Sequence, residues 1–170
     1  MRTVGMGMIG IGIVGWLRAW IHAYRNQIKC MEATIALFRH GIHAMESNPR
    51  PWQEFFAQYE GQDKNLNKFV KQLWEFLSDF RFATGEEAWK EAMMASKIQV
   101  YLPEEGYSLL CESSKGFFGL SKDENKEVLT YYKHRMEECL EQEKRKFCQQ
   151  RKIVLPMGAL GGAMLVILLL

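Results

Sequence analysis

Two uncharged apolar segments, one near each end of the chain, dominate the hydrophobic pattern. Residues 4–17 contain no charged side chain, and residues 153–170 contain none either. A helix needs about 20 mostly apolar residues to cross a bilayer, and both segments approach that length. We therefore predict transmembrane helices over residues 1–21 and 153–170.

The residues between these segments, 22–152, show the spacing of amphipathic helices. Apolar side chains recur every three or four positions, and no run of alternating apolar and polar residues indicates a strand. The first helix is expected to run to about Glu46. Pro49 and Pro51 end it, because a residue that precedes proline resists the helical conformation.

Helix start signals divide the rest of this region. A short helix is expected over 52–59, and a further helix from about Lys64, whose apolar stripe includes Trp74. Capping boxes at Thr84–Glu87 and Ser121–Glu124 open two more helices, and Pro103 suits the first turn of another. Gly116–Leu120 is expected to be a loop. The helix after Ser121 is expected to continue into the second span, whose Pro156 would lie in the first turn of the apolar segment.

These elements predict an all-α protein, namely an antiparallel helical bundle over residues 22–152 with a transmembrane helix on each side. Arg25 and Lys29 follow the first apolar segment, and Lys144–Lys146, Arg151 and Lys152 precede the second. The positive-inside rule places both flanks in the cytoplasm. We therefore expect a two-pass membrane protein with a cytoplasmic bundle and both termini outside.

Charge within the bundle is balanced, which argues against a nucleic-acid-binding function. Residues 22–152 contain all 20 acidic residues and all but two of the 22 basic ones. Nucleic-acid binders normally carry a basic excess that neutralises phosphates. The four cysteines have no paired spacing, and in a reducing compartment we expect them to be free and buried. They are Cys30, Cys111, Cys139 and Cys148.

Glycine patterns in the apolar ends have a packing interpretation. The segments 5–10 and 10–15 both match G-x-G-x-x-G, but that pattern indicates dinucleotide binding only between a strand and a helix. Gly158 and Gly162 are spaced as in close-packed membrane helices, and Gly15 with Ala19 forms a weaker pair. Glycine that is merely tolerated in lipid is an equal alternative.

Candidate chemistry is sparse, and the sequence predicts no catalytic, cofactor-binding or metal-binding residue. His40 and His43 could share a metal ion on one helix face, with Glu46 as the nearest third ligand. Packing or surface histidines are the simpler interpretation. The pairs Glu86/Glu87 and Glu104/Glu105 occupy first helical turns, where acidic residues complement the helix dipole. Glu137/Glu138 lies among basic residues on a solvated helix.

Three alternatives to an anchored scaffold stay open. A cleaved signal peptide would suit the length of the first apolar segment, but Arg18 and Trp20 interrupt the expected cleavage site. A membrane-anchored protein with a metal site at His40 and His43 is the second. A holin-like membrane protein is the third, and the large folded middle argues against it.

The last third of the chain resembles the stage III sporulation protein AB family of endospore-forming bacteria. The resemblance rests on the turn Gly116-x-x-Gly-Leu-Ser121, the long charged helix after it, and the ending Lys152–Leu170 with its Gly-Gly followed by aliphatic residues. The segment 47–51 departs from the family's usual turn. Residues 52–102 match by helix pattern only.

This resemblance implies a sporulation role. The family belongs to a transenvelope complex that joins mother cell and forespore. Its soluble domain is similar to the cytoplasmic domains of the platform proteins of type II secretion and type IV pilus systems, which pair with a cytoplasmic hexameric ATPase. The resemblance therefore implies a non-enzymatic platform in the mother-cell membrane facing the forespore, with this ATPase and other subunits of the complex as partners.

Overall fold

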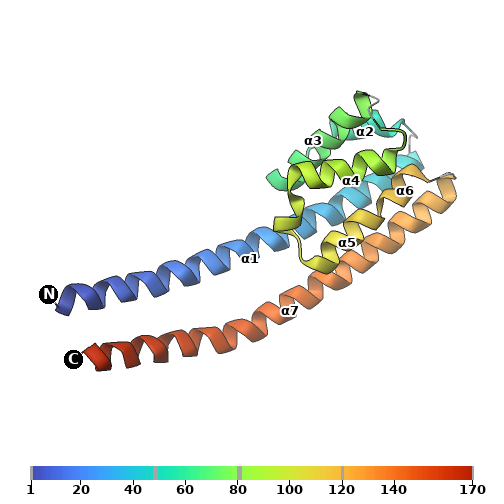
Figure 1. The fold of residues 1–170 in the computed structure, drawn as a ribbon. Coiled ribbons are helices and arrows are strands. Elements are labelled where there is room, and N and C mark those ends of the chain that lie inside the picture. Colours follow the sequence, from blue (N-terminus) through green and yellow to red (C-terminus); the bar gives the residue numbers. More distant parts are fainter. Residues whose placement is uncertain (1, 48–49, 80–81, 120, 170) are drawn as a thin grey trace. The chain divides into compact units, whose positions relative to one another are not determined.

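The computed structural model describes residues 2–47, 50–79, 82–119 and 121–169, and every regular element in these ranges is helical. The prediction of an all-α protein is therefore confirmed. The helices of the described residues follow one another in chain order, and Figure 1 labels α1 to α7. They are α1 (Arg2–Ser47), α2 (Trp52–Gln58), α3 (Lys64–Ser78), α4 (Gly85–Ser96), the 3-10 helix η1 (Ile98–Tyr101), α5 (Glu104–Glu112), α6 (Ser114–Phe118) and α7 (Lys122–Leu169).

The chain divides into two compact units. One unit consists of residues 27–141 and contains the helical bundle, and the other consists of residues 1–26 and 142–170. Helices α1 and α7 each contribute to both units. The boundaries predicted from the sequence, 21/22 and 152/153, mark the expected ends of the membrane spans and not the limits of compact units. They stay predictions.

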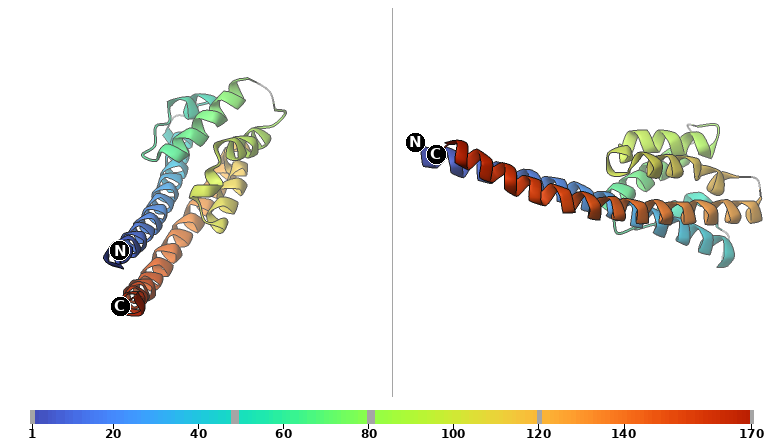
Figure 2. Two further views of the ribbon diagram at one scale, coloured as in Figure 1. Left: turned by 60° about the vertical axis from the view of Figure 1, so that its left-hand side comes forward. Right: turned by 90° about the horizontal axis from the view of Figure 1, so that it is seen from below.

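Within the bundle, α1 and α7 run in opposite directions, and shorter helices cover them (Figure 1). Both views in Figure 2 place α2 beside α1 and α5 beside α7. Hydrogen bonds join the same pairs: the Tyr59 hydroxyl donates to the Ala33 carbonyl at 3.4 Å, and the Tyr132 hydroxyl donates to the Glu112 carboxylate at 3.2 Å. The bundle is antiparallel, as the sequence predicts.

The core of the bundle is centred on the fully buried Trp89 of α4. Its ring lies 5.0 Å from that of Phe69 and 5.1 Å from that of Phe117, measured between centroids. Its indole N–H donates to the Leu110 carbonyl at 2.9 Å. A buried tryptophan needs such a partner for its polar atom, so this single side chain ties α3, α5 and α6 to α4.

Helix starts follow the sequence signals closely. The Thr84 hydroxyl accepts from the Glu87 amide at 3.2 Å, and the Ser121 hydroxyl accepts from the Glu124 amide at 3.3 Å. Asp63 provides a further cap, which was not predicted from the sequence. Its carboxylate accepts from the amides of Asn65 and Leu66, both at 2.9 Å. Each cap satisfies amides that the first helical turn leaves unpaired.

The expected loop at Gly116–Leu120 is wrong for its first half, where α6 extends over Ser114–Phe118. A Cβ atom on Gly116 would lie 2.7 Å from Leu129 Cγ and 3.2 Å from the Leu129 amide nitrogen. The glycine is needed because α6 packs directly onto the backbone of α7 at this point. Leu120 lies outside the described residues.

Helix α7 continues without a break through Pro156. The expected continuity is therefore confirmed, but Pro156 lies inside a long helix and not in a first turn. Within the residues that the structure describes, no helix has a segment both long and apolar enough to cross a membrane. Most side chains of the predicted spans 1–21 and 153–170 lie outside the described ones, and both spans stay predictions.

All four cysteines are free, as predicted. Cys30 and Cys139 are buried, Cys111 is half-buried and Cys148 is exposed, so the expected burial is correct for only two of them. Burial raises the pKa of the Cys30 thiol to about 12, and the neighbouring Asp63 carboxylate adds to this shift.

Candidate docking surface

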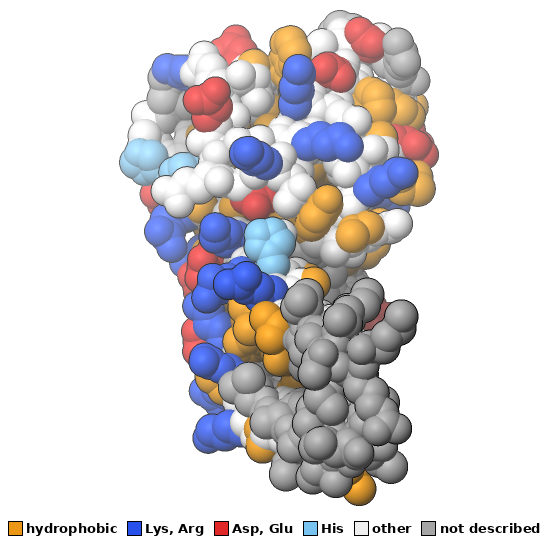
Figure 3. Space-filling view, turned by 90° about the vertical axis from the view of Figure 1, so that its left-hand side faces the viewer, with side chains coloured by type: hydrophobic (Ala, Val, Ile, Leu, Met, Phe, Trp, Pro, Cys, Tyr) orange, Lys and Arg blue, Asp and Glu red, His pale blue; other side chains and the backbone are white. Residues whose placement is uncertain are grey.

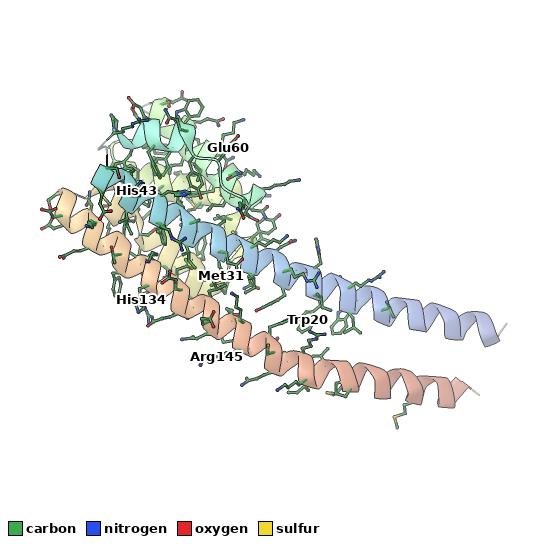
Figure 4. All side chains as sticks on the ribbon, turned by 180° about the vertical axis from the view of Figure 1, so that it is seen from behind. Trp20, Met31, His43, Glu60, His134 and Arg145 are labelled. Carbon is green, nitrogen blue, oxygen red and sulfur yellow. The ribbon has the colours of Figure 1, made fainter. Side chains whose placement is uncertain are left out.

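Two surface clefts in the described part of the bundle lie beside the end of α2, one on each side. The first has a volume of about 420 Å³ and lies between the end of α1 and α2. Its lining includes His40, His43, Arg50, Tyr59 and Glu60. Figure 4 shows His43 on α1 and Glu60 just beyond α2. The residues that line this cleft carry both charge signs and two imidazoles, so it favours no single charge.

Hydrogen bonds and ring contacts already engage several side chains of this cleft. The Arg50 guanidinium donates to the Gln58 side-chain oxygen at 3.2 Å. The His40 and Tyr59 rings meet edge to face with centroids 5.8 Å apart, and the Ser47 hydroxyl lies 3.3 Å from a ring nitrogen of His43. Both histidines therefore have contacts of the kind that packing histidines make.

The alternative of a metal site at His40 and His43 is not supported. Among the described residues, no three His, Cys, Asp or Glu side chains are placed to hold a metal ion. Glu46, the nearest third ligand in sequence, pairs instead with Lys126 of α7 at 2.6 Å. The physical reason is helix geometry, since each step of three residues turns the side chain by about 60°, which directs Glu46 away from His40.

The acidic pairs of the sequence analysis lie on helix surfaces. Glu86 and Glu87 occupy the first turn of α4, and Glu104 and Glu105 that of α5. Arg135 joins Glu105 at 3.3 Å and Glu138 at 2.8 Å. Its pKa is raised, first by the hydrogen bond to Glu138 and then by the charge of that carboxylate. Glu105 and Glu138 therefore belong to a solvated ion-pair network that joins α5 and α7 through Arg135.

The second cleft, of about 300 Å³, lies between α2 and α3. Its lining includes Tyr59, Asn67, Lys71 and Trp74. Trp74 belongs to the apolar stripe of α3 predicted from the sequence, but its side chain is 37% exposed. The Tyr59 ring lines both clefts, and burial raises the pKa of its hydroxyl to about 12.

A strip of lysines continues from this cleft along α3. Lys64, Lys68 and Lys71 are all exposed, and none forms an ion pair within the described part of the chain. Their spacing of four and three residues places them on one side of the helix. Glu75 is the single acidic residue of α3. We call Lys64, Lys68, Lys71 and Trp74 the α3 strip.

The α3 strip offers two features on which a protein contact can be built. An exposed tryptophan beside a cleft can act as a buried anchor in a complex, because binding energy concentrates in such aromatic residues. The unpaired lysines add a positive field that attracts an acidic partner. This strip was not among the predicted sites, although the lysine spacing at 64, 68 and 71 is a signal visible in the sequence.

The glycine pair Gly158 and Gly162 lies in α7, and its surroundings lie outside the described residues. Its packing role stays a prediction.

Comparison with protein families gives one match that covers the chain. The family model of stage III sporulation protein AB matches residues 2–170. Comparison with curated proteins and with solved structures gives no match. The expected resemblance, which rested mainly on the last third of the chain, therefore extends over the bundle as well. The chain belongs to the stage III sporulation protein AB family.

Proposed function

We propose that this chain is a non-enzymatic platform of the complex that joins mother cell and forespore, and that its bundle docks a cytoplasmic hexameric ATPase at the membrane. Membership of a stage III sporulation family supports the sporulation role. The observation that carries the docking function is the α3 strip, where three unpaired lysines adjoin an exposed tryptophan and a cleft.

The anchoring part of the proposal rests on the sequence. Residues 4–17 and 153–170 are uncharged, and basic residues follow the first segment and precede the second. Apolar ends with basic flanks are typical of helices inserted with the flanks in the cytoplasm. In the proposed arrangement, both termini lie outside the cytoplasm, and the bundle faces it from the mother-cell membrane next to the forespore.

The docking part rests on charge and shape. Exposed lysines that form no ion pair among the described residues produce a positive field, which accelerates the encounter with an acidic surface. Trp74 beside the 300 Å³ cleft offers an apolar centre for the contact. We therefore expect the ATPase, or an adaptor segment on it, to present acidic residues around an apolar side chain.

Charge reversal on α3 tests this function. The full chain in detergent is titrated with the cognate cytoplasmic ATPase, alone and as the variant Lys68→Glu/Lys71→Glu. We expect the variant to bind about tenfold more weakly or worse, because attraction at the rim becomes repulsion. Binding of the unmodified chain should also weaken as salt concentration rises.

Lys90→Glu/Lys115→Glu is the matched control, since it reverses the same number of charges at exposed lysines of α4 and α6, outside the α3 strip. This control is expected to bind like the unmodified chain. Equal binding by Lys68→Glu/Lys71→Glu would exclude the α3 strip as the docking surface. No binding by the unmodified chain would contradict the platform function itself.

A further inference from the structure

The unit formed by residues 1–26 and 142–170 concentrates positive charge in two short segments. Residues 18–26 and 142–152 contain seven basic residues and one acidic residue, Glu143. The basic residues are Arg18, Arg25, Lys144, Arg145, Lys146, Arg151 and Lys152. This excess contrasts with the charge balance of residues 22–152 taken together.

Aromatic rings join the two helices at the level of these charges. The Tyr24 and Phe147 rings stack with centroids 3.7 Å apart and an interplanar angle of 4°, and Trp20 lies 5.0 Å from Phe147. Figure 4 shows Trp20 on the side of α1 that faces α7. Burial raises the pKa of Tyr24 to about 12, and Glu143 adds to the shift. The facing sides of α1 and α7 are therefore aromatic here.

The arginines of α1 lie on the side away from these rings. Arg18 and Arg25 share one face with His22, because the three residues are spaced by four and three positions. This face lies roughly opposite Trp20 and Tyr24. A cleft of about 590 Å³ runs along this face, and its lining includes Arg18, His22 and Arg25 together with the apolar Ala19 and Ile21.

The cations of α7 show the same arrangement. Arg145 and Lys152 are seven residues apart and lie roughly opposite Phe147 on the helix. In Figure 4 Arg145 points away from α1, and Figure 3 shows a group of Lys and Arg side chains in its lower left part. Within the described part of the chain, Arg18, Arg25, Arg145 and Lys152 are exposed and form no ion pair.

We propose that the cationic faces of this unit, Arg18 and Arg25 on α1 and Arg145 and Lys152 on α7, bind the headgroups of anionic phospholipids. Guanidinium groups match the phosphate geometry through paired hydrogen bonds, and Ala19 and Ile21 offer apolar contact for the glycerol and upper acyl carbons. Each basic residue at an anionic membrane surface strengthens binding about fivefold. The inference rests on the membrane anchoring in the proposed function, because that anchoring brings these faces to the headgroup level.

Native mass spectrometry of the full chain in non-ionic detergent tests this site. Phosphatidylglycerol and phosphatidylcholine are titrated separately, and the fraction of lipid-bound protein is measured. We expect a clear preference for phosphatidylglycerol. The variants Arg18→Gln/Arg25→Gln and Arg145→Gln/Lys152→Gln are each expected to weaken phosphatidylglycerol binding roughly tenfold or more, since each removes two cations.

The control Lys90→Gln/Lys115→Gln removes two exposed lysines of the bundle and is expected to keep the preference. Equal binding of the two lipids would overturn the proposal. Unchanged phosphatidylglycerol binding by both Arg18→Gln/Arg25→Gln and Arg145→Gln/Lys152→Gln would also overturn it. Binding of inorganic phosphate as tight as that of phosphatidylglycerol would also overturn it, because the site would then recognise any phosphate anion.

A second arm separates this proposal from the anchoring. The full chain is reconstituted into vesicles of pure phosphatidylcholine and washed at alkaline pH. If the chain stays in the washed vesicles but shows no lipid preference in detergent, the headgroup site is contradicted and the anchoring is not. Loss from these vesicles with the preference intact would contradict the anchoring and support the headgroup site.

Discussion

At the scale of the residue, the buried hydroxyl of Tyr59 makes the stability of the bundle depend on pH. Its ring lines both clefts, and its hydroxyl donates to the Ala33 carbonyl over a long 3.4 Å. Burial raises the pKa of the folded-state hydroxyl from 10.0 to about 12. The neutral form is therefore favoured in the folded protein, and ionisation favours the unfolded chain.

The sign of this shift gives a prediction. The stability that Tyr59 contributes is complete below pH 10 and is lost as the pH rises from 10 to 12. Tyr59→Phe should cost under about 1 kcal/mol at neutral pH, because the hydrogen bond is long, and should lose less stability than the unmodified chain over the alkaline window. Denaturant unfolding of the full chain in detergent, followed by circular dichroism across this pH range, measures the difference.

Tyr131→Phe is the matched control, because Tyr131 is 59% exposed. It should follow the unmodified chain at every pH. A Tyr59→Phe variant whose alkaline loss of stability equals that of the unmodified chain would show that this hydroxyl does not carry the effect.

At the scale of the element, the packing of α6 on α7 depends on the absence of a side chain at Gly116. Gly116→Ala would place a methyl group 2.7 Å from Leu129 Cγ, with the Leu129 backbone also close. Because the backbone cannot rotate away as a side chain can, we expect destabilisation of about 1–3 kcal/mol in denaturant unfolding.

Two further variants check the cause of this loss. Gly15→Ala is the control, since a Cβ atom at Gly15 meets nothing within 4 Å, and its stability should stay near that of the unmodified chain. The double variant Gly116→Ala/Leu129→Ala should lose less than the sum of the single losses, because they share one contact. If the stability loss of the double variant equals the sum of the two single losses, the strain of Gly116→Ala does not come from its contact with the Leu129 side chain.

Most helices of the bundle could be predicted from the sequence because their start signals act locally. Thr84 and Ser121 cap the amides three residues ahead, and α1 ends at Ser47, one residue beyond the end expected from the sequence. The five-residue α6 could not be predicted, because two glycines beside two phenylalanines normally indicate a loop. Its helical form depends on the fit of Gly116 against Leu129 of α7, a contact that is distant in sequence.

The site was harder to predict than the fold. His40 and His43 are conspicuous in the sequence, yet Glu46 turns to Lys126 and no metal site forms among the described residues. Trp74 matches the apolar spacing of α3, but no neighbouring element covers it fully, so it is 37% exposed. Which apolar residue stays uncovered depends on the tertiary arrangement, and local pattern does not contain that information.

At the scale of the whole molecule, the proposed function requires a bundle that docks a partner and ends that insert in the membrane. The bundle has its own aromatic core around Trp89, and the terminal segments have the apolar composition of anchors. A rigid bundle held at the membrane can transmit the position of a bound motor to the rest of a complex without any chemistry of its own. The two functions are separable, since the α3 strip and the cationic faces of α1 and α7 lie in different units.

Recruitment of the ATPase to vesicles tests the central claim most directly. The full chain is reconstituted into vesicles, the cognate cytoplasmic hexameric ATPase is added, and the vesicles are floated through a density gradient. We predict that the ATPase floats with vesicles that carry the chain, floats much less with vesicles that carry Lys68→Glu/Lys71→Glu, and does not float with empty vesicles. Vesicles that retain the chain but leave the ATPase at the bottom of the gradient would contradict the platform function.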